Sequence, residues 1–186
     1  GIPADKPEMR NAREFILSKG GVPKVRIFTK IWLSLFGQWE WKGTPAMPPE
    51  LMFLPSWFPC NIYEFSSWAR ATIVPLLIIL AERPVRPAPQ WANIDELYPQ
   101  PRDRTNYSLP RSSALLSWRN VFHLADKLLR LYDMMPIKPG REAAKRRALR
   151  WILAHQEADG SWGGIQPPWV YSLIALKQMG LSMDHP

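Results

Sequence analysis

The stretch that decides the fold is HQEADGSWGGIQPPW, from His155 to Trp169. It carries the pattern Q-x-x-x-G-x-W in Gln156, Gly160 and Trp162, between two segments with helical character. A glycine accepts the positive φ that the chain often needs just beyond a helix end, and a glutamine amide can hydrogen-bond the free backbone groups there. The indole adds a flat face and an N–H donor. The pattern therefore predicts a helix, a tight turn and a second helix.

On its own, Q-x-x-x-G-x-W is equally compatible with a glycine helix stop followed by a core tryptophan, because short motifs match by chance. The longer segment QEADGSWGGIQPPWVYSLIAL, however, resembles the QW repeat and following segment of squalene–hopene cyclases, the bacterial class II triterpene cyclases. Other stretches resemble that family in its order and at its spacing: Met9–Ile16, Lys30–Leu33, Pro48–Glu50, Trp57–Pro59, Asn61–Tyr63 and Ser67–Thr72. The resemblance extends from near residue 9 to Pro186 and is weakest through 85–112.

The resemblance implies an all-α fold that forms part of an α/α toroid, the double α-barrel of terpenoid cyclases. Residues 1–186 would be a partial inserted α-barrel domain, its second half, without the acid-bearing catalytic barrel. Because Gly1 is not an initiator methionine and the chain stops just after a helix, we expect an internal fragment. Helical periodicity alone would equally fit any α-solenoid.

Apolar spacing predicts helices at 7–19, 24–36, 61–82, 112–135, 141–155 and 169–179, a short one at 49–53, and no convincing strand. The first two helices are expected to form an antiparallel pair. Residues 71–81 are almost wholly apolar, but the run is too short to cross a bilayer and contains Pro75, so we expect a buried core helix. Residues 83–112 are rich in proline, arginine and asparagine and predict an irregular segment.

Composition and net charge limit the kinds of partner and cofactor that we expect for the chain. The net charge of +8 favours an anionic partner, yet no nucleic-acid recognition motif is present, so binding of nucleic acid is not expected. The basic residues between Arg141 and Arg150 are read as a solvated helix face. A single cysteine, Cys60, and three scattered histidines offer no metal site. We expect neither a metal nor an organic cofactor.

The segment 112–135 has one broad apolar face and one charged face. A helix packed on a core and a helix lying on a membrane fit this pattern equally well. The resemblance favours the second, because in hopene cyclases the corresponding region belongs to a nonpolar plateau that dips into one leaflet around the squalene entry channel. The expected membrane-facing residues are Leu115, Trp118, Val121, Phe122, Leu128 and Leu129.

Class II cyclisation begins with protonation of an alkene, which requires an unusually strong carboxylic acid. The family supplies this acid from a D-x-D-D motif, and no D-x-D-D occurs in the chain. The acidic doublet Asp95-Glu96 is expected to be solvated surface. We therefore expect no catalytic acid in these residues and no cyclase activity from them alone.

The resemblance implies parts of a substrate cavity. Trp68 matches a tryptophan that lines it, although an ordinary buried tryptophan is the more probable reading from the sequence alone. Ile165, Gln166 and Pro167 match the far end of the cavity, where the glutamine helps to hold water for the final step. Phe65 and Ile73 match a constriction between the entry channel and the cavity.

The expected parent is thus a squalene–hopene cyclase, an isomerase that converts squalene to hopene or hopanol in hopanoid biosynthesis. It would lie on the cytoplasmic face of the bacterial inner membrane as a monotopic protein, and a homodimer of the parent is compatible with the resemblance. An oxidosqualene cyclase fragment and a non-catalytic helical module that binds membranes are the alternatives. GGIQPPW and the proline-rich WFP segment disfavour the oxidosqualene branch.

Overall fold

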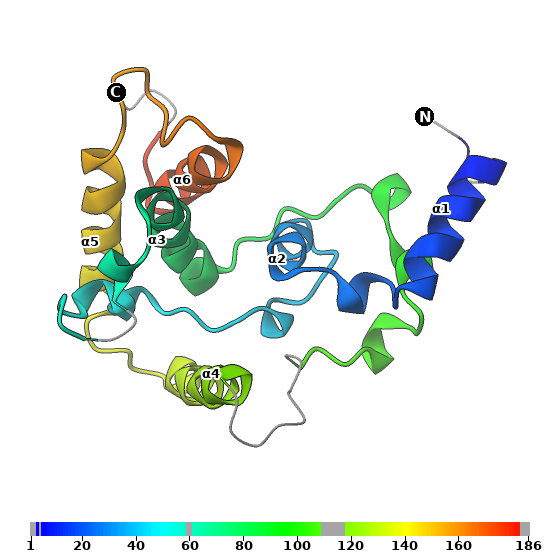
Figure 1. The fold of residues 1–186 in the computed structure, drawn as a ribbon, viewed down its shortest axis with the longest axis horizontal. Helices are drawn as coiled ribbons and strands as arrows, with labels where there is room; N and C mark the ends of the chain where they lie inside the picture. The colour runs from blue at the N-terminus through cyan, green and yellow to red at the C-terminus, as the bar shows by residue number, and fades with distance from the viewer. Residues whose placement is uncertain (1–2, 4, 59–60, 109–117, 183–186) are drawn as a thin grey trace. The chain divides into compact units, whose positions relative to one another are not determined.

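The computed structural model describes residues 3, 5–58, 61–108 and 118–182, which form six α-helices and several short 3-10 turns without a strand. The helices are α1 (Pro7–Ser18), α2 (Ile27–Leu35), α3 (Ser67–Glu82), α4 (Trp118–Met134), α5 (Arg141–Ala154) and α6 (Gln166–Gln178) (Figure 1). The predicted all-α class is therefore confirmed. No helix within these residues combines the length and hydrophobicity that crossing a bilayer requires.

The chain forms two compact units. The first unit contains residues 1–45 and 85–110, and the second contains residues 46–84 and 111–186. The predicted irregular segment completes the first unit, where it makes the 3-10 turns η5 (Gln90–Ala92), η6 (Asp95–Leu97) and η7 (Arg102–Arg104). The chain thus leaves the first unit after α2 and returns to it after α3.

The first unit is built around a small aromatic core of Val22, Trp39 and Tyr98. The Tyr98 hydroxyl donates to the carbonyl of Gln38, and Arg102 donates at 2.6 Å to the side-chain oxygen of that same glutamine. The returning segment is therefore fixed by buried aromatic packing and by hydrogen bonds to the end of α2.

The antiparallel pair predicted for the first two helices is wrong. The main contacts of α1 are with η6, and those of α2 are with η2 (Trp41–Gly43). A 3-10 turn, η1 (Val22–Lys24), separates the two helices and sets the direction of the chain between them. The apolar residues of α1 are few, and none of its residues is fully buried, so helical spacing alone could not identify its partner.

In the second unit, α3 is the central helix and packs along α6 and α5 (Figure 1). Its residues from Val74 to Leu80 are buried, as predicted for a core helix. Two alanines of α5, Ala144 and Ala148, are fully buried, and such small side chains permit close approach between helices. α5 also packs on η3 (Pro49–Phe53), the short helix that the sequence predicts.

Two helix starts differ from the prediction. α3 begins at Ser67 and not near residue 61, because the buried Asn61 instead caps the 3-10 turn η4 (Ile62–Glu64) by accepting a hydrogen bond of 2.7 Å from the Tyr63 N–H. α6 begins before Trp169, since Pro167 and Pro168 occupy a first turn in which backbone N–H donors have no helical partner.

Candidate functional site

The turn between α5 and α6 is organised by Trp162, which is 1% exposed. Its indole N–H donates a hydrogen bond of 2.8 Å to the carbonyl of Ile152, in the last turn of α5. Gly160 has a φ of +83°, and its carbonyl accepts a hydrogen bond from the amide of Gln156 at 3.3 Å. The glutamine side chain thus bridges the two ends of the turn, while the tryptophan provides a hydrogen-bond donor for a carbonyl at the end of α5.

The sequence reasoning missed Glu157, which ties the same turn together. Its carboxylate accepts hydrogen bonds from the Gly163 N–H at 3.0 Å and from the Ser161 hydroxyl at 3.3 Å. Next to it, a hydrogen bond from the Ser161 N–H lowers the pKa of Asp159 below its usual value. The signal that could have indicated this role is an acidic residue shortly after a helix end and before a glycine turn.

The cavity-wall residue predicted on α3, Trp68, and the two predicted constriction residues, Phe65 and Ile73, lie on or just before α3 in the second unit. Trp68, the second residue of the helix, is 61% exposed, and Phe65, just before the helix, is also exposed. Ile73 is half-buried. The alternative that Trp68 is an ordinary buried core tryptophan is therefore wrong for this chain, in contrast to Trp162.

The other cavity candidates lie where α6 begins. Ile165 is the residue that precedes the helix, Gln166 and Pro167 open it, and the first two of these are exposed. Trp169 and Leu173 follow Ile165 at intervals of four residues and are also exposed, so they extend one apolar line along α6. Because α6 packs along α3, both sets of candidates belong to adjoining helices.

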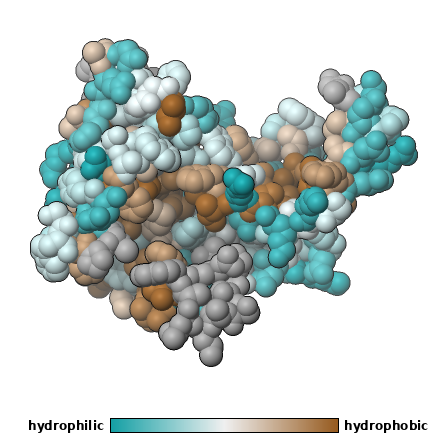
Figure 2. Space-filling model, in the orientation of Figure 1, coloured by the Kyte–Doolittle hydropathy of each residue, from teal (hydrophilic) through white to brown (hydrophobic). Residues whose placement is uncertain are grey.

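Helix α4 presents its apolar side to the exterior and its polar side to the protein. The exposed side carries a stripe at intervals of three and four residues, which we call the apolar stripe: Val121, Leu124, Leu128, Leu131 and Met135. Leu128 is 60% exposed, whereas Asp126 on the opposite side is 7% exposed. In Figure 2, hydrophobic surface lies over α4. Among the described residues, the apolar stripe is therefore exposed, and the polar side of α4 faces the rest of the second unit.

The predicted membrane-facing residues fall into three groups. Val121, Phe122 and Leu128 are exposed, and their membrane contact stays a prediction. Leu129 is half-buried at the edge of the polar side, because a helix turns about 100° per residue. Leu115 and the side chain of Trp118 lie outside what the structure describes. Leu124 and Leu131, which the sequence prediction did not name, are also exposed, and their spacing of four and three residues from Leu128 could have indicated this.

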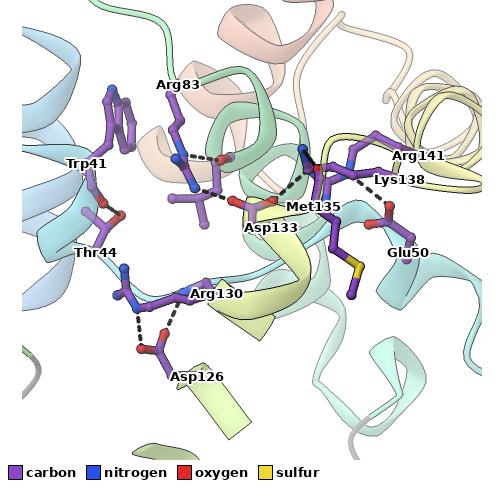
Figure 3. Close-up of polar contacts among 12 residues, drawn as sticks. Trp41, Thr44, Glu50, Arg83, Asp126, Arg130, Asp133, Met135, Lys138 and Arg141 are labelled. Carbon is purple, nitrogen blue, oxygen red and sulfur yellow. Dashed lines mark hydrogen bonds and ion pairs between the residues drawn. The ribbon is translucent and has the colours of Figure 1, made fainter. Parts of the chain in front are cut away.

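Polar side chains attach α4 to the rest of the second unit at two places. Near its middle, the carboxylate of Asp126 accepts a hydrogen bond of 2.7 Å from the backbone N–H of Ala46, and it pairs with Arg130 at 2.6 Å. Near its end, Asp133 pairs with Arg83 and, at 2.8 Å, with Arg141 (Figure 3).

Glu50 joins the second of these attachments. Its Oε1 accepts hydrogen bonds from the Tyr132 hydroxyl at 2.7 Å and from Arg141 Nε at 2.9 Å. Burial raises the pKa of Tyr132, and the hydrogen bond to Glu50 raises it further. Burial alone would lower the pKa of Arg141, but its hydrogen bonds to Glu50 and Asp133 more than offset this and leave the pKa raised.

The acidic doublet of the first unit is engaged in surface ion pairs. Asp95 pairs with Arg102, and Glu96 pairs with Arg13 at 2.8 Å. Both carboxylates are largely exposed, as predicted for solvated surface. Within the described part of the chain, no group of three or more histidine, cysteine or acidic residues could hold a metal ion.

The whole chain, residues 1–186, matches the family model described as the squalene-hopene cyclase N-terminal domain. It is 45% identical over its full length to a squalene–hopene cyclase of Alicyclobacillus acidocaldarius and covers 28% of that protein. It is also similar over its full length to the dammaradiene synthase of Dryopteris crassirhizoma, at 36% identity and 27% coverage of that protein. A squalene–hopene cyclase of Zymomonas mobilis shares 32% identity, with 28% of its length covered.

The chain therefore spans little more than a quarter of the length of these relatives. The family match covers every element that builds the surfaces described above, from α1 to α6. We conclude that this chain belongs to the squalene-hopene cyclase N-terminal domain family.

Proposed function

We propose that this chain is part of a squalene–hopene cyclase that converts squalene into hopene and hopanol. In this proposal its residues supply cavity wall, channel lining and the membrane contact, and the protonating acid comes from elsewhere in the parent protein. The names of the relatives support the hopene branch over an oxidosqualene cyclase. They also make a non-catalytic binding module the less favoured alternative.

The exposed aromatic and apolar residues of α3 and α6 suit a wall for a hydrocarbon substrate. A carbocation that forms along a folded polyene is stabilised by aromatic faces and must be kept away from water and bases. Trp68 offers such a face, and Ile165 and Pro167 add apolar surface without a base. Gln166, at the start of α6, would hold water for the terminal step. Phe65 and Ile73 would line the constriction through which squalene arrives.

The single observation that carries the proposed membrane contact is the orientation of α4. Burying one leucine side chain is worth about 1.5–3 kcal/mol, so an outward stripe with three leucines is costly in water. A helix with this apolar face and a charged opposite face lies at a bilayer surface with its apolar side in the acyl boundary. We place this surface on the cytoplasmic face of the bacterial inner membrane.

Partition of the full-length protein onto phosphatidylcholine vesicles tests this contact. The double variant Leu124→Asp/Leu128→Asp should partition at least tenfold more weakly, because two charges replace two exposed leucines. Lys127→Gln is the matched control, since Lys127 is an exposed residue of the same helix outside the apolar stripe. Partition of the double variant equal to that of the wild type would contradict the proposed membrane contact.

A further inference from the structure

We propose that the rotation of α4 about its own axis is set by an ionic clasp, whose residues control membrane binding without contacting lipid. The clasp consists of Glu50, Arg83 and Arg141 from the body of the second unit, with Tyr132 and Asp133 from α4. This inference rests on the proposed membrane contact of α4. It assigns the five polar residues a positioning role.

The three body residues of the clasp come from three different elements. Glu50 lies in η3, Arg83 directly follows α3, and Arg141 is the first residue of α5 (Figure 3). α5 packs on both α3 and η3, so the three elements form one frame. Asp133 lies 50 residues after Arg83 in the sequence, and Tyr132 lies 82 residues after Glu50. Residues so distant meet only because the fold holds α4 in one orientation.

The backbone of Arg83 supports this role. Its φ is +50°, and it is the one non-glycine residue with a positive φ among the described residues. A glycine is the usual residue at this position after a helix, because it has no side chain to clash there. An arginine is strained at such a position, but only a side chain can reach Asp133. The strain is thus coupled to the contact with α4.

The part of the clasp around Arg141 is largely shielded from water, whereas the Arg83 side chain is 48% exposed. The Arg141 side chain is 12% exposed, and its partners Asp133 and Glu50 are also largely shielded from water. Salt and water screen such pairs much less than they screen exposed ones. The clasp therefore opposes the tendency of the apolar stripe to turn inward, which the hydrophobic effect favours when the protein is in water.

Two sets of variants of the full-length protein test the clasp, and each should keep the fold. Tyr132→Phe/Asp133→Asn removes the contacts from the side of α4 while preserving the shape of both side chains. Arg83→Gly removes the contact between Arg83 and Asp133 from the side of the body and also relieves the positive φ. The matched control is Lys145→Met, because Lys145 is 11% exposed and bridges α5 to Glu82 of α3 at 2.5 Å without touching α4.

Two readouts report the orientation of α4. The first is partition onto phosphatidylcholine vesicles, which we expect to fall at least tenfold in both clasp variants and to stay near the wild-type value in Lys145→Met. The second is the reaction rate of a thiol introduced by Leu128→Cys, in a protein whose other cysteines, Cys60 included, are replaced by serine. Without vesicles, this thiol should react several-fold more slowly in the clasp variants, because the stripe turns inward.

The outcomes separate the two proposals. If the wild-type protein does not partition onto vesicles, the proposed membrane contact itself fails. If the wild type partitions and the clasp variants match it in both partition and thiol reactivity, the clasp inference is overturned. It is also overturned if Lys145→Met loses as much partition as Arg83→Gly, because the loss would then report general destabilisation.

Discussion

The indole N–H of Trp162 donates a hydrogen bond to the backbone carbonyl of Ile152, ten residues earlier in the chain. This bond joins the turn before α6 to the end of α5, so one side chain fixes the passage between two helices. These contacts explain the Q-x-x-x-G-x-W pattern in physical terms. The tryptophan donates to a carbonyl at the end of α5, and the glutamine donates to a carbonyl within the turn.

Trp162→Phe should reduce stability by about 2–4 kcal/mol, because the smaller ring leaves a cavity in a fully buried site and the Ile152 carbonyl loses its hydrogen-bond donor. The midpoint of urea unfolding, followed by circular dichroism, measures this effect. Trp91→Phe is the control, since the Trp91 side chain is almost fully exposed. An equal shift in both variants would show that the bond to Ile152 contributes nothing specific.

Asn61→Ala should destabilise the second unit by about 2–4 kcal/mol, because it leaves several buried backbone groups without partners. The Asn61 side chain is fully buried, donates to the carbonyls of Ser56 and Phe58, and accepts from the Tyr63 N–H. Asn106→Ala, at an exposed asparagine, should change stability by less than about 0.5 kcal/mol. Thermal unfolding that leaves the two variants indistinguishable would refute this role for Asn61.

The first unit should lose stability in alkali through Tyr98. Burial raises the pKa of its phenol to about 12, although the nearby Arg102 opposes the shift. An unfolded tyrosine has a pKa of about 10, so between these values unfolding releases a proton and stability falls as the pH rises. Urea midpoints between pH 9 and 12 should decline less steeply in Tyr98→Phe than in the wild type. Parallel declines would exclude Tyr98 as the cause.

Trp68→Ala should lower the rate of squalene conversion by about tenfold or more, because the loss of an aromatic face near a carbocation is worth roughly 1–2 kcal/mol. Its effect on stability should stay within about 1 kcal/mol, since Trp68 is exposed in this chain. The full-length protein is assayed for both properties, with Trp91→Ala as the control. A variant with unchanged turnover would remove Trp68 from the proposed cavity wall.

Local patterns were enough to predict most helices and the buried centre of the second unit. The spacing of apolar residues identified α3 as a core helix, and Gly160 with Trp162 identified the turn before α6. These features depend on neighbours within a few residues. The membrane reading of α4 needed the resemblance, because an amphipathic pattern looks the same whether its apolar side faces a core or the exterior.

Long-range partners could not be predicted in the same way. The contact between Tyr132 and Glu50 joins residues 82 positions apart, and the sequence near either residue does not predict that the two are partners. The antiparallel pairing of the first two helices failed for a related reason, since helical spacing describes a helix but not what it packs against.

Conversion of squalene tests the central claim most directly, with the products identified by gas chromatography and mass spectrometry. The full-length protein should yield hopene and hopanol, and residues 1–186 alone should yield no cyclic product, because they carry no D-x-D-D acid. The absence of any cyclic product from the full-length protein would contradict the proposed function. Product from residues 1–186 alone would contradict the account of the acid and point to Asp95 or Glu96.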